Sequence, residues 1–231
     1  MTQSNTESDI RLALVQAMQS MVQKKLSQGA SGNMSVRADE GMLVTPTGIT
    51  PEQMAAEHIV AMHLDGRVAE EQLTPSSEWR MHADVYRHMP QVKAIVHCHS
   101  PYATILACAR KAIPALHYMV AAAGSDTIPI ADYATFGTQG LSEANLRALA
   151  DARACLLANH GQLTTGNSLE EALGLADLVE ELAHCYWGTL AIGGPHVLND
   201  KQMDDVLIAF ANYGQQEQSV GTSRGDTTDE E

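Results

Sequence analysis

Three histidines stand at the ends of short apolar runs and could together hold a metal ion. His97 and His99 end the β-branched run that begins at Val92, and residues two apart on a strand point to the same side. His160 ends a second apolar run, and Gly161 leaves room beside it. A catalytic zinc takes three protein ligands, commonly neutral imidazoles, and keeps one position open for water or substrate. The pattern favours a three-histidine metal site. Each histidine taken alone could also be an unrelated residue that ends a strand.

A carboxylate and two hydroxyls stand at the start of a predicted helix over 78–89. The hydroxyls of Ser76 and Ser77, with the backbone N–H groups of the first turn, could bind an anion such as phosphate. Glu78 adjoins this loop, so a bound sugar phosphate would place its reacting carbons near it. Partial burial can give such a carboxylate the raised pKa that a general base needs. Each feature also has a structural explanation, since serine commonly caps a helix and glutamate is favoured in its first turn.

Together these groups suggest cleavage of a sugar phosphate beside a carbonyl group. A metal would polarise the carbonyl as a Lewis acid and stabilise the enediolate left by proton removal or carbon–carbon cleavage. Aldol cleavage can also use a lysine Schiff base. The five lysines, however, all occupy polar settings unsuited to that chemistry: Lys24, Lys25, Lys93, Lys111 and Lys201. A metal is therefore the better explanation.

Several helices are needed to position these groups. Apolar periodicity and capping patterns predict helices over 8–26, 78–89, 101–110, 142–151, 168–192 and 200–213. A further short helix is expected to start at Thr50. The expected caps of three of them are Ser100, Ser142 and Ser168.

Strands and loops complete the expected framework. Besides the two histidine strands, the sequence predicts hairpins over 34–45 and 58–70 and an edge strand over 128–130. Three loops rich in glycine, serine and threonine lie at 29–33, 45–48 and 73–78. Three such loops favour an anion site more than any one of them alone.

The composition limits the class of protein. With 231 residues we expect a single domain over 1–214 and a polar tail over 215–231 that is disordered in isolation. A formal charge of −14 makes nucleic acid and anionic membranes poor partners. No apolar stretch approaches a membrane span and no signal-like segment opens the sequence, so we expect a cytoplasmic protein. The four cysteines fit reduced thiols, and Cys98 should face away from the two histidines.

Seven short motifs follow one another in an order and spacing that match a known family. They are Ser31–Arg37, Thr45–Gly48, Pro75–Glu78, His97–His99, His117–Tyr118, Ala134–Thr138 and Asn159–Gly161. In these segments the sequence resembles the zinc-dependent class II aldolases of the L-fuculose-1-phosphate type. The resemblance runs from about Arg11 to Tyr213, which makes it far more specific than any single motif.

The resemblance implies a fold and an assembly. The expected fold is α/β in a layered α+β arrangement, with a central, mainly antiparallel β-sheet flanked by helices, as in class II aldolases and adducin head domains. A homotetramer with active sites between subunits is also expected. Tyr118, supplied by a neighbouring subunit, would exchange a proton with the aldehyde-side oxygen, and Tyr213 resembles a second tyrosine on a C-terminal segment.

The resemblance also implies roles for individual residues. His97, His99 and His160 would hold one Zn²⁺ per subunit, with Glu78 nearby as acid/base and as a further ligand before substrate binds. The positions that match the family's phosphate site are Gly32, Asn33, Thr47, Gly48, Ser76 and Ser77. Other divalent transition metals also suit imidazole ligands.

The implied reaction is reversible cleavage of a ketose 1-phosphate to dihydroxyacetone phosphate and a short aldehyde. L-fuculose 1-phosphate is the first expectation, and a 5-deoxy-ketose or methylthioribulose 1-phosphate is the alternative, because 214–217 lacks the family's arginine there. A pentulose-5-phosphate 4-epimerase, which usually has Asp at the position of Glu78, and a methylthioribulose-1-phosphate dehydratase share the scaffold. A non-enzymatic adducin-like role is the remaining alternative, but adducin heads lack the metal histidines that this sequence keeps.

Overall fold

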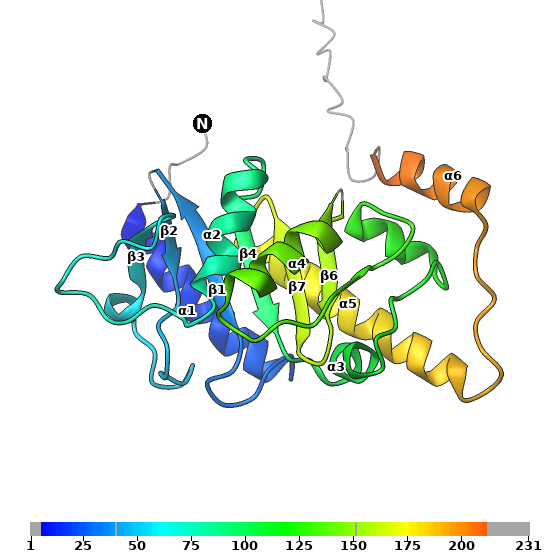
Figure 1. Cartoon of the computed structure of the whole chain (residues 1–231), viewed down its shortest axis with the longest axis horizontal. Helices are drawn as coiled ribbons and strands as arrows, with labels where there is room; N and C mark the ends of the chain where they lie inside the picture. Colours follow the sequence, from blue (N-terminus) through cyan, green and yellow to red (C-terminus); the bar gives the residue numbers. More distant parts are fainter. Residues whose placement is uncertain (1–5, 40, 151, 212–231) are drawn as a thin grey trace, which may run out of the picture.

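A seven-stranded sheet forms the centre of the molecule in the computed structural model, which describes residues 6–39, 41–150 and 152–211 (Figure 1). The strands are β1 (Asn33–Ala38), β2 (Gly41–Val44), β3 (Val60–His63), β4 (Ala94–Cys98), β5 (Ile130–Ala131), β6 (Ala154–Leu157) and β7 (Gly161–Gly166). Their order is β3-β2-β1-β4-β7-β6-β5. Only β5 and β6 pair in parallel, and the other neighbours are antiparallel. The predicted mainly antiparallel sheet is thereby confirmed.

Helices cover both faces of this sheet. They are α1 (Glu7–Gln23), α2 (Trp79–His88), α3 (Pro101–Cys108), α4 (Gln139–Leu149), α5 (Leu169–Leu190) and α6 (Asp200–Ala211), with 3₁₀ turns η1 (Ala56–His58) and η2 (Tyr118–Ala123). On the central strand, Ile95 packs in the cluster of α2 and α4, whereas Val96 packs in the cluster of α1 and α5. Cys98 belongs to the second cluster, which confirms that it turns away from the histidines. None of the described helices is long and apolar enough to cross a membrane.

The predicted helix cap at Ser142 is wrong, the one at Ser100 lacks its side-chain bond, and long-range contacts explain both. The N-cap of α4 is Thr138, while Ser142 is buried inside the helix and donates a hydrogen bond of 2.7 Å to Asp84 Oδ2 on α2. Ser100 is the N-cap residue of α3, as predicted, but its side chain makes no capping hydrogen bond. The carboxylate of Glu180 on α5 instead accepts the N–H groups of residues 102 and 103 at 2.8 and 2.9 Å. The cap predicted at Ser168 is confirmed, because its hydroxyl accepts the N–H of residue 171.

The strand prediction missed β7, and the short helix at Thr50 is wrong. β7 lies between β4 and β6, and all of its residues are buried although several are polar. The hydroxyl of Thr164 donates a hydrogen bond of 2.8 Å to the Ala172 carbonyl of α5. Thr50 leads into a turn rather than a helix. The predicted partner of β3 at 67–70 contributes only a single bridge, between Met62 and Val68.

The structure describes only part of the C-terminal region for which the sequence makes predictions. The edge strand predicted near 128–130 appears as β5 at the edge of the sheet. α6 lies at one corner of the molecule beside η2 (Figure 1). The boundary at 214 and the tail over 215–231 lie outside the described residues and stay predictions.

Candidate active site

Four side chains from separate segments converge at one end of β4. His97 lies in β4, His99 follows it, His160 occupies the turn between β6 and β7, and Glu78 precedes α2. The Nε2 atoms of His97 and His99 are 3.0 Å apart. The Glu78 carboxylate oxygens lie 3.2 Å from His97 Nε2 and 3.5 Å from His160 Nε2. One nitrogen or oxygen from each of the four side chains lies within 4.8 Å of all the others, a cluster that could hold a metal ion.

Backbone contacts orient the histidines of this cluster. His97 Nδ1 lies 2.8 Å from the Gln162 carbonyl oxygen, which can only accept, so Nδ1 carries a proton and Nε2 is the ring nitrogen that faces the cluster. The backbone N–H of His99 donates to Ser27 Oγ at 3.2 Å. A Cβ on Gly161 would lie 2.4 Å from the Cys98 carbonyl oxygen, so the turn that presents His160 tolerates only glycine at this position.

The electrostatics of the cluster match what a cation needs. Burial lowers the pKa of His99 to about 3 and that of His160 to about 4, so both rings are neutral near pH 7. Burial raises the pKa of Glu78, but His97, His160 and the Asn33 amide outweigh burial and hold this pKa well below its usual range, so the raised pKa expected from the sequence is wrong. Neutral imidazoles and an ionised carboxylate are the forms that bind metal.

One carboxylate oxygen has no hydrogen-bond partner among the described groups. Glu78 Oε1 is buried and accepts no hydrogen bond, whereas Oε2 accepts from Asn33 Nδ2 at 3.0 Å. An unpartnered buried charge is costly, and a bound cation would remove that cost. The donor set and this orphaned oxygen therefore fit a divalent metal ion.

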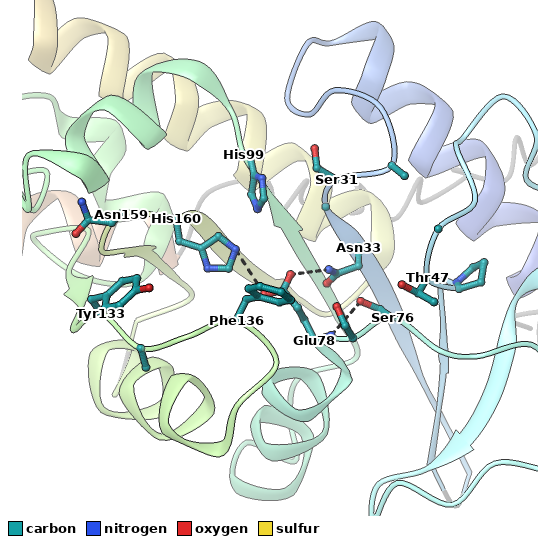
Figure 2. A pocket seen from close by; sticks show the side chains of 16 residues that line it. Ser31, Asn33, Thr47, Ser76, Glu78, His99, Tyr133, Phe136, Asn159 and His160 are labelled. Carbon is teal, nitrogen blue, oxygen red and sulfur yellow. Dashed lines mark hydrogen bonds and ion pairs between the residues drawn. The ribbon is translucent and has the colours of Figure 1, made fainter.

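A pocket of about 350 Å³ opens beside the cluster, and three loops form its wall (Figure 2). It is lined by Glu78, His99 and His160 and by all six residues predicted for phosphate binding: Gly32, Asn33, Thr47, Gly48, Ser76 and Ser77. The backbone N–H of Thr47 donates to the Thr74 carbonyl at 3.1 Å, and that of Ser76 donates to the Thr45 carbonyl at 3.0 Å. Two of the loops are thus joined to each other, and the pocket brings the predicted residues together.

Comparison with known proteins identifies the family. Residues 12–187 match the family model described as the class II aldolase and adducin N-terminal domain. The chain belongs to this family. A 5-methylthioribulose-1-phosphate/5-deoxyribulose-1-phosphate aldolase of Rhodospirillum rubrum is 44% identical over 205 residues, which cover 89% of this chain and 92% of that relative. An L-fuculose phosphate aldolase of Escherichia coli is 47% identical over 195 residues, covering 84% of this chain and 90% of that relative.

Solved structures support the same assignment. An L-fuculose 1-phosphate aldolase superposes with a TM-score of 0.86 at 36% identity, covering 91% of this chain and 100% of that one. The chain is accordingly an enzyme of the class II aldolase type, a lyase.

Some residues of this class II aldolase pocket were not predicted as site residues, and one predicted residue lies elsewhere. Tyr133 and Phe136 line the pocket with exposed fractions of 56% and 64%, and Asn159 lines it beside His160. Phe136 and Asn159 belong to two of the sequence motifs, Ala134–Thr138 and Asn159–Gly161. Tyr133 lies outside the motifs, and only the structure shows that its ring is exposed in a pocket. Tyr118 is 52% exposed and lies outside the pocket, near Phe210 of α6. Tyr213 lies outside the described residues.

Removing the metal should make the stability of this class II aldolase depend on pH. Burial lowers the pKa of His82 and His99 to about 3 and that of His160 to about 4. An unfolded histidine has a pKa near 6.5, so between about pH 6.5 and 4.5 the unfolded state binds more protons, while Glu78 is ionised in both states. As the pH is lowered through this range, the free energy of unfolding should fall by on the order of 1 kcal/mol per pH unit for each of these histidines. Urea unfolding of chelator-treated protein from pH 7 to pH 5 measures this slope; a flat profile would contradict neutral buried rings.

Proposed function

We propose that this chain is a zinc-dependent aldolase that reversibly cleaves a ketose 1-phosphate to dihydroxyacetone phosphate and a short aldehyde. The observation that carries the proposal is the orphaned Glu78 Oε1 in a cluster with three imidazoles, at the side of a pocket formed by polar loops. His97, His99 and His160 would hold one zinc per subunit, and three imidazoles are a known zinc ligand set. When bound, the metal supplies a Lewis acid that stabilises negative charge on oxygen beside the carbonyl.

The protein's own groups would bind and orient the substrate. The phosphate would lie among the N–H groups of Gly32, Gly48 and Ser77 and the hydroxyls of Thr47, Ser76 and Ser77, which line the pocket together. Since the whole chain carries a formal charge of −14, these local donors rather than the overall field must hold the anion.

Glu78 would serve as the acid/base of the reaction. Its carboxylate faces the histidines of the cluster, and the N–H of Glu78 donates to Ser76 Oγ at 3.2 Å (Figure 2). A substrate with its phosphate on the loops and its carbonyl toward the histidines would place its reacting carbon between these two regions. Glu78 would then move a proton at the carbon next to the carbonyl.

The identity of the aldehyde end of the substrate is suggested by the names of the relatives. Among the relatives, one is named for L-fuculose phosphate and another for 5-methylthioribulose and 5-deoxyribulose 1-phosphates. We propose L-fuculose 1-phosphate as the first substrate, with the other two ketose phosphates as alternatives. Tyr118 is exposed outside its own chain's pocket, so it would reach a site only from a neighbouring subunit of a homotetramer.

A coupled assay for dihydroxyacetone phosphate tests the function directly. Zinc-loaded protein should release this product from at least one of L-fuculose, 5-deoxyribulose and methylthioribulose 1-phosphates. A chelator should abolish the release and added zinc should restore it, because the charge stabilisation beside the carbonyl depends on the metal. The absence of product from all three substrates would contradict the aldolase proposal, and isomer interconversion without free triose phosphate would support an epimerase instead.

A further inference from the structure

A row of buried polar side chains leads from Glu78 into the interface between β1 and α2. On the helix side, Glu78, His82 and Tyr86 recur every four residues, and on the strand side Asn33 and Ser35 are two apart. Four helical residues rise about 6 Å and two strand residues about 6.6 Å, so the two rows stay nearly in register along their lengths. All five side chains are buried.

Short hydrogen bonds join these residues into one chain. Asn33 Nδ2 donates to Glu78 Oε2 at 3.0 Å, and Asn33 Oδ1 lies 2.6 Å from His82 Nε2. On its other side, His82 Nδ1 lies 2.7 Å from Ser35 Oγ. Ser35 Oγ lies 2.8 Å from the hydroxyl of Tyr86. A continuous path of four contacts therefore connects the carboxylate at the metal cluster with a buried tyrosine.

The ionised carboxylate at one end sets the direction of every bond in the chain. Glu78 can only accept, so the amide of Asn33 must turn its –NH₂ to Glu78 and its carbonyl oxygen to His82. Burial lowers the pKa of His82 to about 3, so the neutral ring has one N–H, and that proton must be on Nε2. Nδ1 then accepts from Ser35, whose oxygen accepts from Tyr86. The donors run from Tyr86 to Glu78 without interruption.

The far end of the chain is fixed by Arg37, which belongs to the same row of β1. Its guanidinium lies over the Tyr86 ring, 4.6 Å from the centroid. Arg37 Nη2 donates to the Tyr86 carbonyl and Nε donates to the Val92 carbonyl, both at 2.8 Å. These bonds attach β1 to the end of α2 and restrict the position of the Tyr86 side chain.

We propose that His82 is a positioning residue that, through its Nε2–H, fixes the amide of Asn33 so that its –NH₂ faces Glu78. An amide can otherwise rotate by half a turn, which would place its oxygen against the Glu78 carboxylate. The catalytic consequence of this positioning rests on the proposed function, in which Glu78 is the acid/base. His82 is neither one of the four cluster residues nor a residue that lines the pocket, and its hydrogen bond toward the site goes to Asn33.

Two similar substitutions of His82 separate positioning from general stability. In His82→Gln the side-chain –NH₂ can replace the Nε2–H donor, whereas in His82→Asn the shorter amide reaches only the Nδ1 position. Loss of a group that orients a ligating residue typically lowers activity 10- to 100-fold. We therefore expect kcat to fall by about that factor in His82→Asn and by less than about threefold in His82→Gln. Val85→Ala is the matched control on the same helix: this buried core change should lower the melting temperature and leave kcat unchanged.

A neutron structure of the full-length protein tests the proton positions without any assay. We expect deuterium on His82 Nε2 and none on Nδ1. Deuterium on Nδ1, or equal losses of kcat in the Gln and Asn variants, would overturn the positioning role. Failure of the wild-type protein to release dihydroxyacetone phosphate would instead contradict the proposed function, because the neutron result does not depend on the reaction.

Discussion

Replacing His97 with alanine should remove metal and activity together. His97 is fully buried, its Nε2 faces His99 and Glu78, and its Nδ1 is held by the Gln162 carbonyl. The substitution leaves two imidazoles and a carboxylate around an enlarged space, so zinc should no longer be retained at one per subunit. Lewis-acid stabilisation is worth several kcal/mol, and each 1.4 kcal/mol is tenfold, so kcat/KM should fall by about a thousandfold or more.

The measurement combines metal analysis with the aldolase assay on one preparation of His97→Ala. His63→Ala is a suitable control, because His63 is a partly buried histidine on β3, outside the metal cluster. That variant should keep both zinc and turnover. Stoichiometric zinc in His97→Ala would argue against a ligand role for His97, whatever its activity.

The histidine cluster shows what the sequence can predict about this site. The period of two along a strand places His97 and His99 on one side, and the apolar run before His160 predicts a second strand end. The relation between these two ends depends on β7, which lies between β4 and β6 and joins them. β7 was missed because its polar residues carry no apolar pattern, and they are buried only because α5 supplies partners such as the Ala172 carbonyl.

Side chains that act across the fold were the least predictable. Ser142 and Ser100 have the residue type of helix caps, but a carboxylate on α2 and an amide on β7 use their hydroxyls instead. The role of Asn33 is a similar case. Its motif predicts a phosphate contact, whereas the structure also bonds its amide to Glu78 and His82. Such partners lie more than 40 residues away, beyond any local pattern.

Replacing Glu78 with glutamine should abolish turnover while keeping most of the metal. The three imidazoles are unchanged, and the amide oxygen of glutamine can still accept the hydrogen bond from Asn33 Nδ2. Glutamine cannot take up a proton as a carboxylate does, and acid–base groups typically contribute a hundred- to ten-thousandfold, so kcat should fall by about that factor. Because the phosphate loops are untouched, KM should change much less than kcat.

The separation of metal content from turnover is what identifies the acid/base. Glu57→Gln, an exposed substitution with the same change of charge, is the control and should leave zinc and kcat unchanged. If Glu78 served only as a ligand, Glu78→Gln would lose zinc and added zinc would restore its rate. If Glu78 moves the proton, excess zinc restores nothing, because the missing group is a carboxylate that the metal does not replace. Near-normal kcat in the zinc-loaded variant would exclude Glu78 as the acid/base and leave a tyrosine as the remaining candidate for proton transfer.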